Sequence, residues 1–370
     1  MSDTPIPLVD LAAQHRQIAD EVTDGFRRVF DTTAFIHGPD VAAFEEEFAA
    51  FCGVRHCVGV ANGTDAVELA LRVVGVGAGD QVVVPANTFI ASAEAVVRAG
   101  AQPLFVDCDP VHQLIDVDQA LAAASQARAV LAVDLFGQLA PLDDLQAGLG
   151  GGPCVLVEDA AQSQGATADG RGVGSVAAVA ATSFYPGKNL GAYGDAGAVV
   201  TDRSDLADAV RLLGDHGSRM RYAHEVIGIN SRLDTLQAVV LRAKLRRLPE
   251  WNEQRQKAAQ WYRDALVDVD GVGLPEIAPG NEHVWHLFVV RVARRDAVIE
   301  HLHDVGVGAG IHYPVPIHLQ PAFAHLGHHV GDFPRAEAAA AEILSLPIFP
   351  GITEAQQSRV VAALATAVAR

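Results

Sequence analysis

One lysine stands apart from the other basic side chains of this 370-residue chain. Only three of its 27 basic residues are lysines, namely Lys188, Lys244 and Lys257. Lys244 and Lys257 fall in a long helical pattern and are expected to be solvated, whereas Lys188 lies in a glycine-punctuated loop, Ser183 to Asp195. Arginine cannot form a Schiff base, because its guanidinium stays protonated and delocalised. Lys188 is therefore the candidate for amine chemistry, and an ordinary surface lysine is the alternative.

A second candidate site is the segment from Val60 to Ala66, where a predicted strand turns into a helix. Gly63 lets the backbone approach a ligand closely, and Thr64 offers a hydroxyl group. The helix that follows directs free N–H groups at the turn, an arrangement that suits a phosphate. The alternative is a simple helix cap made by Thr64 or Asp65.

A third candidate site is the pair of carboxylates, Glu158 and Asp159, that ends an apolar predicted strand, with Gln162 close behind. A carboxylate at a buried strand end needs a cationic partner, and a protonated ring nitrogen would supply one. The alternative is an acid at a helix N-terminus. Phosphate clamp, ring-nitrogen partner and reactive lysine are together the requirements of pyridoxal 5′-phosphate, and Ser183 adds a further phosphate donor.

The elements that must position these residues alternate between strand and helix from about residue 38 to 213. Strands are predicted at 56–60, 81–84, 103–106, 129–133, 154–158, 176–184 and 196–201. Helices are predicted at 44–51, 65–74, 91–99, 116–124 and 204–213. The alternation predicts an α/β fold whose mostly parallel sheet is covered on both faces. Ligands of such sheets lie beyond the carboxyl ends of the strands.

A long predicted helix, Leu236 to Leu266, breaks this alternation. A smaller α/β segment follows, with a strand at 284–290, a helix at 296–304 and two late alanine-rich helices. We place the domain boundary near Leu248. This gives a large domain of residues 1–248 with an N-terminal helix, and a small C-terminal domain of residues 249–370.

Composition excludes several classes of function. A net charge of −18 argues against binding nucleic acid or an anionic membrane through bulk charge. The four cysteines lack CxxC spacing and are expected to be free, mostly buried thiols. The histidines lack a partnering carboxylate or thiolate cluster, so no metal site is predicted. Without a signal-like segment or an apolar run of ~18 residues, a cytoplasmic location is expected.

Taken in order, these motifs resemble the DegT/DnrJ/EryC1/StrS family of sugar aminotransferases, which are fold-type I pyridoxal-phosphate enzymes. The similarity runs from Pro7 to the C-terminus. It includes the segments 37–39 (HGP), 62–66 (NGTDA), 84–89 (VPANTF), 157–162 (VEDAAQ), 184–191 (FYPGKNLG), 230–234 (NSRLD) and 312–318 (HYPVPIH).

The resemblance implies transfer of an amino group from L-glutamate to a keto carbon of a nucleotide-linked deoxysugar, with a dTDP sugar the first choice. Lys188 would form the Schiff base with the cofactor and shuttle the proton, and Asp159 would pair with the pyridinium nitrogen. The remaining implied cofactor contacts are Gln162 to the ring hydroxyl, Phe89 stacked on the ring, Gly63, Thr64 and Ser183 to the phosphate, and Asn230 to the same phosphate from the neighbouring subunit. The enzyme is therefore expected to be a homodimer with shared active sites.

The segment from His216 to Tyr222 is the expected binding site, or seat, of the substrate's nucleotide. It contains Arg219, Arg221 and Tyr222, and arginine forks match phosphate oxygens. The loop from His312 to His318 is expected to complete the seat through His312, Tyr313 and His318. The alternative is a solvated loop that pairs with nearby acids.

Two residues depart from the family pattern. Asp134 replaces a frequent histidine, and Phe35 lies where a tyrosine or tryptophan is common. Both are expected near the substrate side. Two rival functions are a related sugar dehydratase and a non-catalytic regulator. Family dehydratases replace the lysine with histidine, and intact Lys188, Asp159 and Gln162 argue against a regulator.

Overall fold

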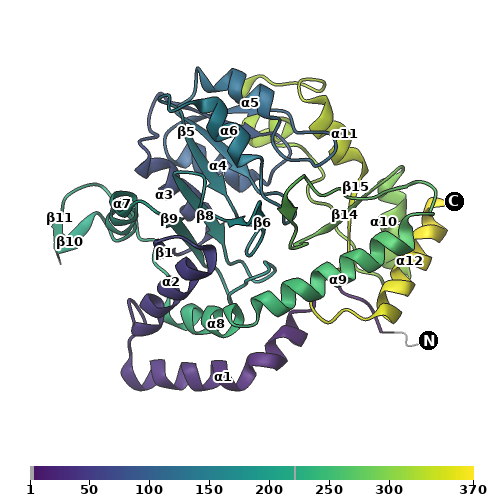
Figure 1. Cartoon of the computed structure of the whole chain (residues 1–370), viewed down its shortest axis with the longest axis horizontal. Helices are drawn as coiled ribbons and strands as arrows, with labels where there is room; N and C mark the ends of the chain where they lie inside the picture. Colours follow the sequence, from purple (N-terminus) through teal and green to yellow (C-terminus); the bar gives the residue numbers. More distant parts are fainter. Residues whose placement is uncertain (1–3, 221) are drawn as a thin grey trace.

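A seven-stranded sheet forms the centre of the computed structural model, which describes residues 4–220 and 222–370 (Figure 1). The strand order is β1-β9-β8-β5-β4-β2-β3. These strands are β1 (His56–Val60), β2 (Gln81–Pro85), β3 (Gln102–Val106), β4 (Ala129–Val133), β5 (Val155–Asp159), β8 (Val179–Ser183) and β9 (Gly197–Thr201). β9 is antiparallel to β1 and β8, and all other neighbours are parallel. The predicted mostly parallel α/β sheet is confirmed.

Helices cover both faces of this sheet, because its strands are apolar at nearly every position. One face carries α3 (Gly63–Val73), α4 (Ile90–Arg98) and α7 (Ser204–Gly214). The other carries α2 (Pro39–Cys52), α5 (Val117–Ala124), α6 (Leu142–Leu149) and α8 (Thr235–Leu245). The carboxyl ends of β1, β2, β4, β5 and β8 therefore share one edge, and the predicted motifs lie at this edge.

The long helix predicted for 236–266 is two helices, α8 and α9 (Leu248–Leu266). Pro249 explains the break, since proline lacks an N–H and fits only the first turn of a helix. Lys257 is exposed as expected, but the expectation for Lys244 is wrong, because its exposed fraction is 2%. α8 packs against both α1 (Leu11–Thr32) and α2 and is buried on most sides.

The C-terminal part has a second, antiparallel sheet in the order β12-β14-β15. Its strands are β12 (Val272–Gly273), β14 (Phe288–Val292) and β15 (Ile343–Leu346). α9, α10 (Arg295–Asp304) and α12 (Glu354–Val368) share a separate hydrophobic core with this sheet and lie together near the marked C-terminus in Figure 1. A small sheet joins β6 (Thr167–Ala168), β7 (Arg171–Gly172) and β13 (Asn281–Glu282). The domain boundary near Leu248 falls where α9 begins and stays a prediction.

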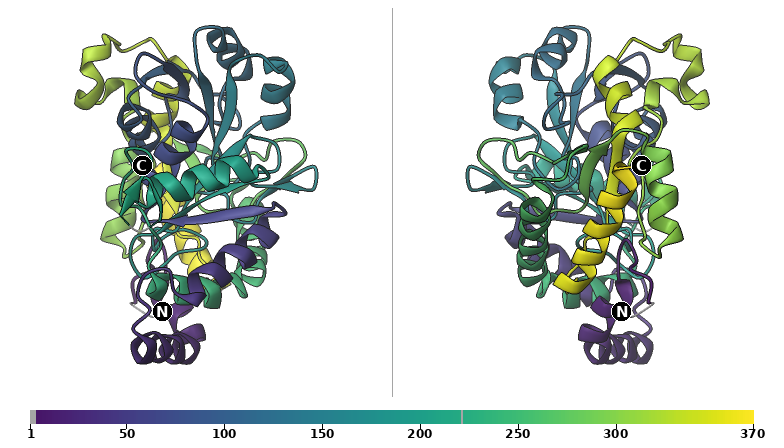
Figure 2. Two further views of the ribbon diagram at one scale, coloured as in Figure 1. Left: turned by 90° about the vertical axis from the view of Figure 1, so that its left-hand side faces the viewer. Right: turned by 90° about the vertical axis from the view of Figure 1, so that its right-hand side faces the viewer.

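Part of the C-terminal chain returns to the large sheet, where its light green ribbon lies beside the blue helices (Figure 2). It contains the short helices η1 (Ile317–Leu319) and η2 (Pro321–Leu326) and the helix α11 (Pro334–Glu342). Phe323 and Phe333 pack edge-on against Phe105 of β3, with ring centroids 5.8 and 6.4 Å away. The edge strand β3 is thereby covered by residues more than 200 positions later in the sequence.

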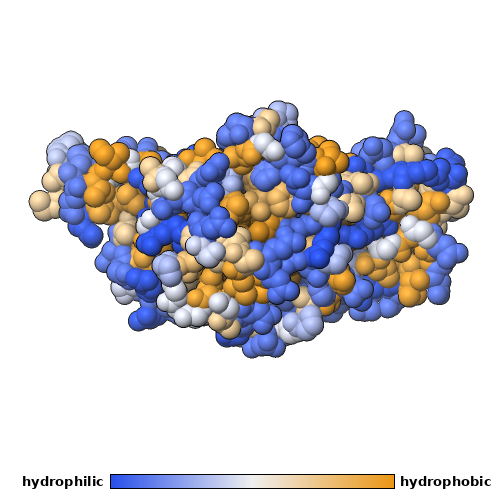
Figure 3. All heavy atoms as spheres, turned by 90° about the horizontal axis from the view of Figure 1, so that it is seen from above, coloured by the Kyte–Doolittle hydropathy of each residue, from blue (hydrophilic) through white to orange (hydrophobic). Residues whose placement is uncertain are grey.

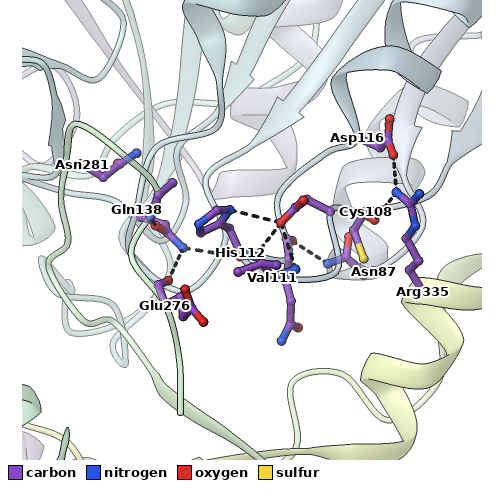
Figure 4. A network of polar contacts seen from close by, with 12 residues as sticks. Asn87, Cys108, Val111, His112, Asp116, Gln138, Glu276, Asn281 and Arg335 are labelled. Carbon is purple, nitrogen blue, oxygen red and sulfur yellow. Dashed lines mark hydrogen bonds and ion pairs between the residues drawn. The ribbon is translucent and has the colours of Figure 1, made fainter. Parts of the chain in front are cut away.

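A loop between β3 and α5 ties the two parts of the chain together through polar contacts (Figure 4). Arg335 donates to the Cys108 carbonyl and forms an ion pair with Asp116. Gln138 donates to the carbonyls of His112 and Glu276, each at 3.4 Å. These contacts fix the C-terminal part beside the carboxyl edge of the large sheet.

One hairpin projects from the body of the molecule at the left of Figure 1. It is formed by β10 (Ser218–Met220) and β11 (Ala223–His224). Seen from above, apolar side chains gather at this end of the molecule (Figure 3). Met220 is 70% and Ile227 89% exposed. Among the described residues, no helix is long and apolar enough to cross a membrane, and the four cysteines are free and buried, as expected.

Candidate active site

A cavity of ≈ 720 Å³ at the carboxyl edge of the large sheet brings the three sequence motifs together. Its lining includes nine residues singled out from the sequence: Gly63, Thr64, Phe89, Asp159, Gln162, Ser183, Lys188, His312 and Tyr313. Asp159 and Ser183 end β5 and β8, and the others come from loops and helix starts that follow β1, β2, β5 and β8 and from the loop before η1. Residues up to 250 positions apart in the sequence therefore face one space.

The turn after β1 has the geometry of an anion site. Gly63 is the first residue of α3, and a Cβ placed there would lie 2.5 Å from the Cβ of Ser183. Only glycine permits that approach. The cap of α3 is Asn62, whose Oδ1 accepts from the backbone N–H of Asp65 at 2.8 Å, so capping by Thr64 or Asp65 is the wrong alternative. The first N–H groups of α3 and the hydroxyls of Thr64 and Ser183 remain for a ligand.

Asp159 ends β5 as a buried carboxylate oriented by two donors. Its Oδ2 accepts from Ser92 Oγ at 2.7 Å, and its Oδ1 accepts from the Ala161 N–H at 3.2 Å. Burial raises the pKa of Asp159, and the two hydrogen bonds and the charge of Lys188 partly oppose this rise. A further cation beside it would favour the ionised form. Sequence reasoning missed Ser92, a small polar residue in the first turn of α4.

Lys188 is half-buried in a tight turn, where its N–H donates to the Tyr185 carbonyl at 2.8 Å. Burial lowers the pKa of Lys188 to about 8, and the charge of Asp159 opposes this shift. An amine with a pKa this close to neutrality is partly unprotonated and can act as a nucleophile or a proton acceptor. Lys188 and Asp159 thus face the cavity as a coupled cation and anion.

Gln162 is held from both sides. Its Oε1 accepts from the Phe136 N–H at 2.7 Å, and its Nε2 donates to the hydroxyl of Tyr313 at 3.2 Å. The ring of Tyr313 lies 5.0 Å from that of Phe89, tilted by 35°. Phe89 keeps 49% of its surface exposed and forms an aromatic wall of the cavity.

A buried amide chain anchors the loop next to Lys188, and sequence reasoning missed it. The side chain of Asn189 donates to Asn252 Oδ1 at 3.0 Å and to the Val284 carbonyl at 2.9 Å. Asn189 Oδ1 must then accept, so His286 Nδ1, 3.2 Å away, carries the proton. His286 lines the cavity, and the loss of water on burial keeps its pKa well below the usual value.

Asn230 does not line the main cavity. It lines a second cavity of ≈ 370 Å³ together with Ile36, Arg232 and Asp195, and Asp195 is common to both cavities. The contact of Asn230 with a cofactor phosphate therefore stays a prediction.

The expected substrate residues are not all brought together. Arg219 lies on the projecting hairpin, 3.4 Å from Glu225, and lines a third cavity of ≈ 460 Å³. Tyr222 is 81% exposed on the same hairpin, and Arg221 lies outside the described residues. His318 is 1% exposed, pairs with Glu337 at 3.1 Å, and is absent from the lining of the main cavity.

The expectation that Asp134 lies on the substrate side is wrong. Its exposed fraction is 0%, and it lies on the opposite face of the sheet from Asp159. Phe35 is 44% exposed, and its carbonyl accepts from the Thr235 N–H, away from the main cavity. Among the described residues, no group of three histidine, cysteine or acidic side chains could hold a metal ion.

Comparison with known proteins adds to this geometry. Residues 16–365 match the model of the DegT/DnrJ/EryC1/StrS aminotransferase family. The chain is 48% identical to the "Erythromycin biosynthesis sensory transduction protein EryC1" of Saccharopolyspora erythraea, over 97% of this chain and 98% of that one. It is 45% identical to a "dTDP-3-amino-3,4,6-trideoxy-alpha-D-glucose transaminase" of Streptomyces venezuelae, over 98% and 96%.

A solved structure is also similar over nearly the whole chain. The crystal structure of S. venezuelae DesV in complex with a ketimine intermediate superposes with a TM-score of 0.97. It is 44% identical in sequence, and the match covers 99% of each chain.

Proposed function

The chain belongs to the DegT/DnrJ/EryC1/StrS aminotransferase family, and on that premise we propose that it is a pyridoxal-phosphate-dependent sugar aminotransferase. It would move an amino group from L-glutamate onto the keto carbon of a nucleotide-linked deoxysugar, with a dTDP sugar as the first candidate. The observation that carries this proposal is that Lys188, Asp159 and the N-terminus of α3 face one cavity.

The cavity fits the cofactor in the kinds of group that line it. The close approach of Gly63 to Ser183 gathers the start of α3 and the hydroxyls of Thr64 and Ser183 at one place in the cavity lining, and together they could hold an anion. Asp159 is a buried carboxylate whose remaining need is a cation, which a protonated ring nitrogen provides. Gln162 lines the cavity and would contact the ring hydroxyl of the cofactor, and Phe89 would offer a flat apolar wall for the ring.

In the proposed mechanism Lys188, Asp159 and Ser92 have different tasks. Bound in the cavity, pyridoxal phosphate supplies an aldehyde that captures amino groups and a ring that takes up the electron pair when a carbon-bound proton leaves. Lys188 Nζ would accept that proton and return it to the neighbouring carbon, since its pKa of about 8 allows both protonation states near neutrality. Asp159 would hold the ring-nitrogen proton, and Ser92 Oγ would keep the Asp159 carboxylate in place.

The enzyme would work as a homodimer in which Asn230 reaches the phosphate of the neighbouring subunit. Phe30 near the end of α1, and Phe35 and Ile36 just after it, expose 54%, 44% and 42% of their surface, and Ile36 lines the second cavity with Asn230. Large apolar side chains gathered in this way are typical of a surface covered by another chain, and a second copy is the proposed cover.

The nucleotide would be held by Arg219 and Tyr222 of the projecting hairpin, with His312 and Tyr313 at the cavity, and Arg221 stays a predicted contact from the sequence alone. Arg219 has a weak ion pair with Glu225 at 3.4 Å between exposed side chains, which a diphosphate could replace. His318 would support the loop that carries His312 and Tyr313, since it is paired with Glu337. A cytoplasmic location is part of the proposal, because nucleotide sugars and glutamate are metabolites of that compartment.

A regulatory role is the second candidate, because one similar protein is named a sensory transduction protein. Such a role needs neither a lysine of lowered pKa nor an aspartate aimed into the same cavity. The catalytic proposal therefore takes precedence.

A panel of nucleotide-linked 3-keto and 4-keto sugars, each incubated with glutamate, tests the proposal. We expect glutamate-dependent formation of one amino sugar and equimolar 2-oxoglutarate, and no product with Lys188→Ala. A fully cofactor-loaded protein that aminates none of the panel, yet binds one of these sugars, would favour the regulatory candidate.

A further inference from the structure

Three carboxyl groups, those of Asp134, Glu158 and Asp159, lie near the carboxyl end of β5. Successive residues of a strand point to opposite faces, so Asp159 faces the cavity and Glu158 faces the far side of the sheet. Ala132 of β4 lies opposite Glu158 in the register. Asp134, two residues further on, therefore points to the same far side. Glu158 and Asp134 each have an exposed fraction of 0%.

The hydrogen bonds of the two far-side carboxyls are unequal. Asp134 Oδ1 accepts from the Ala140 N–H at 2.8 Å, and Oδ2 accepts from Ser163 Oγ at 2.7 Å. Glu158 Oε2 accepts from the Gly174 N–H at 2.9 Å. Glu158 Oε1 is sealed from solvent and has no donor. A carboxylate oxygen left in that state is costly, whereas a protonated one can itself donate.

Within residues 4–220 and 222–370, no cationic side chain pairs with either carboxyl to offset two negative charges. None of the ion pairs among the described residues includes Asp134 or Glu158. The titratable groups that act on the pair are the carboxyl of Asp159 on the same strand and the thiol of Cys52 on α2. All of these are neutral or negative, so two adjacent buried carboxylates cannot both be ionised.

The pKa shifts of the two carboxyls indicate that Glu158 carries the proton. Burial raises the pKa of Asp134 to about 7, although hydrogen bonds from Glu158, Ala140 and Ser163 oppose the rise. Burial also raises the pKa of Glu158 well above its usual value, and the negative charge of Asp134 raises it further. The proton therefore belongs on Glu158 and the charge on Asp134.

We propose that Glu158 stays protonated at neutral pH, donates from Oε1 to the Asp134 carboxylate, and with it forms a positioning pair behind the active site. Asp134 holds Ser163, the residue next to Gln162, and its own N–H donates to the Asp159 carbonyl at 3.0 Å. Asp159 is then the single carboxyl of the three that faces the cavity. The shared proton is independent of the proposed function, whereas the positioning role rests on it.

Infrared spectroscopy of the full-length protein tests the proton directly. The C=O band of a buried protonated carboxyl is expected in the wild type at pH 7 and is lost in Glu158→Gln. The matched control Glu253→Gln, on the exposed side of α9, keeps the band. The proposal is overturned if the wild type shows no such band, or if Glu158→Gln leaves the band in place.

Stability against pH gives an independent readout. The folded pKa of Glu158 is raised above the unfolded one, so the wild type loses stability as pH rises from about 4.3, the usual value for glutamate. Glu158→Gln keeps the bonds to Gly174 and Asp134 and escapes this loss. The ratio of its folding equilibrium constant to that of the wild type should grow by up to tenfold per pH unit, until the pH reaches the folded pKa of Glu158. A difference that does not grow with pH, or a Glu158→Gln variant as unstable at pH 7 as Glu158→Ala, contradicts a protonated Glu158.

Ser163→Ala tests the positioning role, because it cuts the link between Asp134 and the turn that carries Gln162. It should lower kcat by about tenfold or more, shift the visible band of the bound cofactor, and keep the infrared band of Glu158. Wild-type kcat and spectrum in Ser163→Ala sink the positioning role. If the wild type aminates no sugar, the proposed function fails, while the infrared and stability results still decide the shared proton.

Discussion

At the scale of residues, pKa alone does not identify the reactive lysine. Burial lowers the pKa of Lys188 and of Lys244 to about 8. The two differ in access, because Lys188 lines the main cavity whereas Lys244 lies over the ring of Tyr193, 5.1 Å from its centroid, and is absent from that lining. A reactive lysine therefore needs both a lowered pKa and access to an open cavity.

Borohydride reduction of the cofactor-loaded protein, followed by peptide mapping, should label Lys188 alone. Lys188→Ala should abolish turnover without loss of the fold, and Lys257→Ala, which removes an exposed lysine, should leave turnover unchanged. Label on Lys244 would mean that the cavity does not select the reactive amine.

The hydroxyl of Ser92 should set the acid side of the activity profile. Its hydrogen bond favours ionised Asp159, so Ser92→Ala raises the already elevated pKa of that carboxyl further. The acid limb of kcat against pH should therefore move to higher pH, whereas Asp159→Asn should lower kcat by ~10²-fold or more at every pH. An acid limb unmoved in Ser92→Ala would show that Asp159 does not control it.

At the scale of elements, the strand ends were predictable and the links between them were not. The spacing of apolar runs fixes β1 and β4 at their observed bounds, because strands buried on both faces read as continuous apolar runs. The chain of amide hydrogen bonds from Asn189 through Asn252 to the Gln164 carbonyl could not be predicted from the sequence. Its partners lie 63 and 88 residues apart, and no local pattern encodes contacts over such separations.

Gly63 should be required for cofactor binding, because a methyl group there collides with Ser183. Gly63→Ala should weaken cofactor affinity by an amount typical of forced overpacking, about 1–3 kcal/mol, as measured by titration of the cofactor's absorbance. Gly77→Ala is the matched control, since a Cβ at Gly77 meets nothing within 4 Å. Equal cofactor affinity in the two variants would show that the turn after β1 does not bind the phosphate.

At the scale of the whole molecule, the sequence predicted the α/β class and its mostly parallel sheet, but it misplaced two residues whose burial depends on tertiary packing. Lys244 is buried because α8 packs against both α1 and α2, and Asp134 lies behind the sheet rather than at the substrate. In both cases the residue type suggested water or a ligand. Lys244 is instead covered by neighbouring helices, and Asp134 is held by hydrogen bonds from Ala140 and Ser163. The hairpin with Arg219 projects from the body, so a single chain does not complete the expected nucleotide seat (Figure 1).

Subunit mixing should reveal a shared site. Lys188→Ala and Asn230→Ala subunits are each expected to be severely impaired, but a mixed dimer has one site with both residues intact. Random pairing makes about half of the dimers mixed, so roughly a quarter of wild-type activity should return. If activity does not recover although subunit exchange is demonstrated, Asn230 does not contribute to the active site of the neighbouring subunit.

A single-turnover measurement of the cofactor's visible absorbance tests most directly whether the protein is an aminotransferase. The purified, cofactor-loaded protein should be yellow, lose the colour when L-glutamate is added, and regain it with a nucleotide-linked keto sugar while amino sugar forms in equal amount. Lys188→Ala should not complete this cycle. A protein that holds the cofactor, yet keeps its spectrum unchanged with L-glutamate and with other amino acids, would contradict the account.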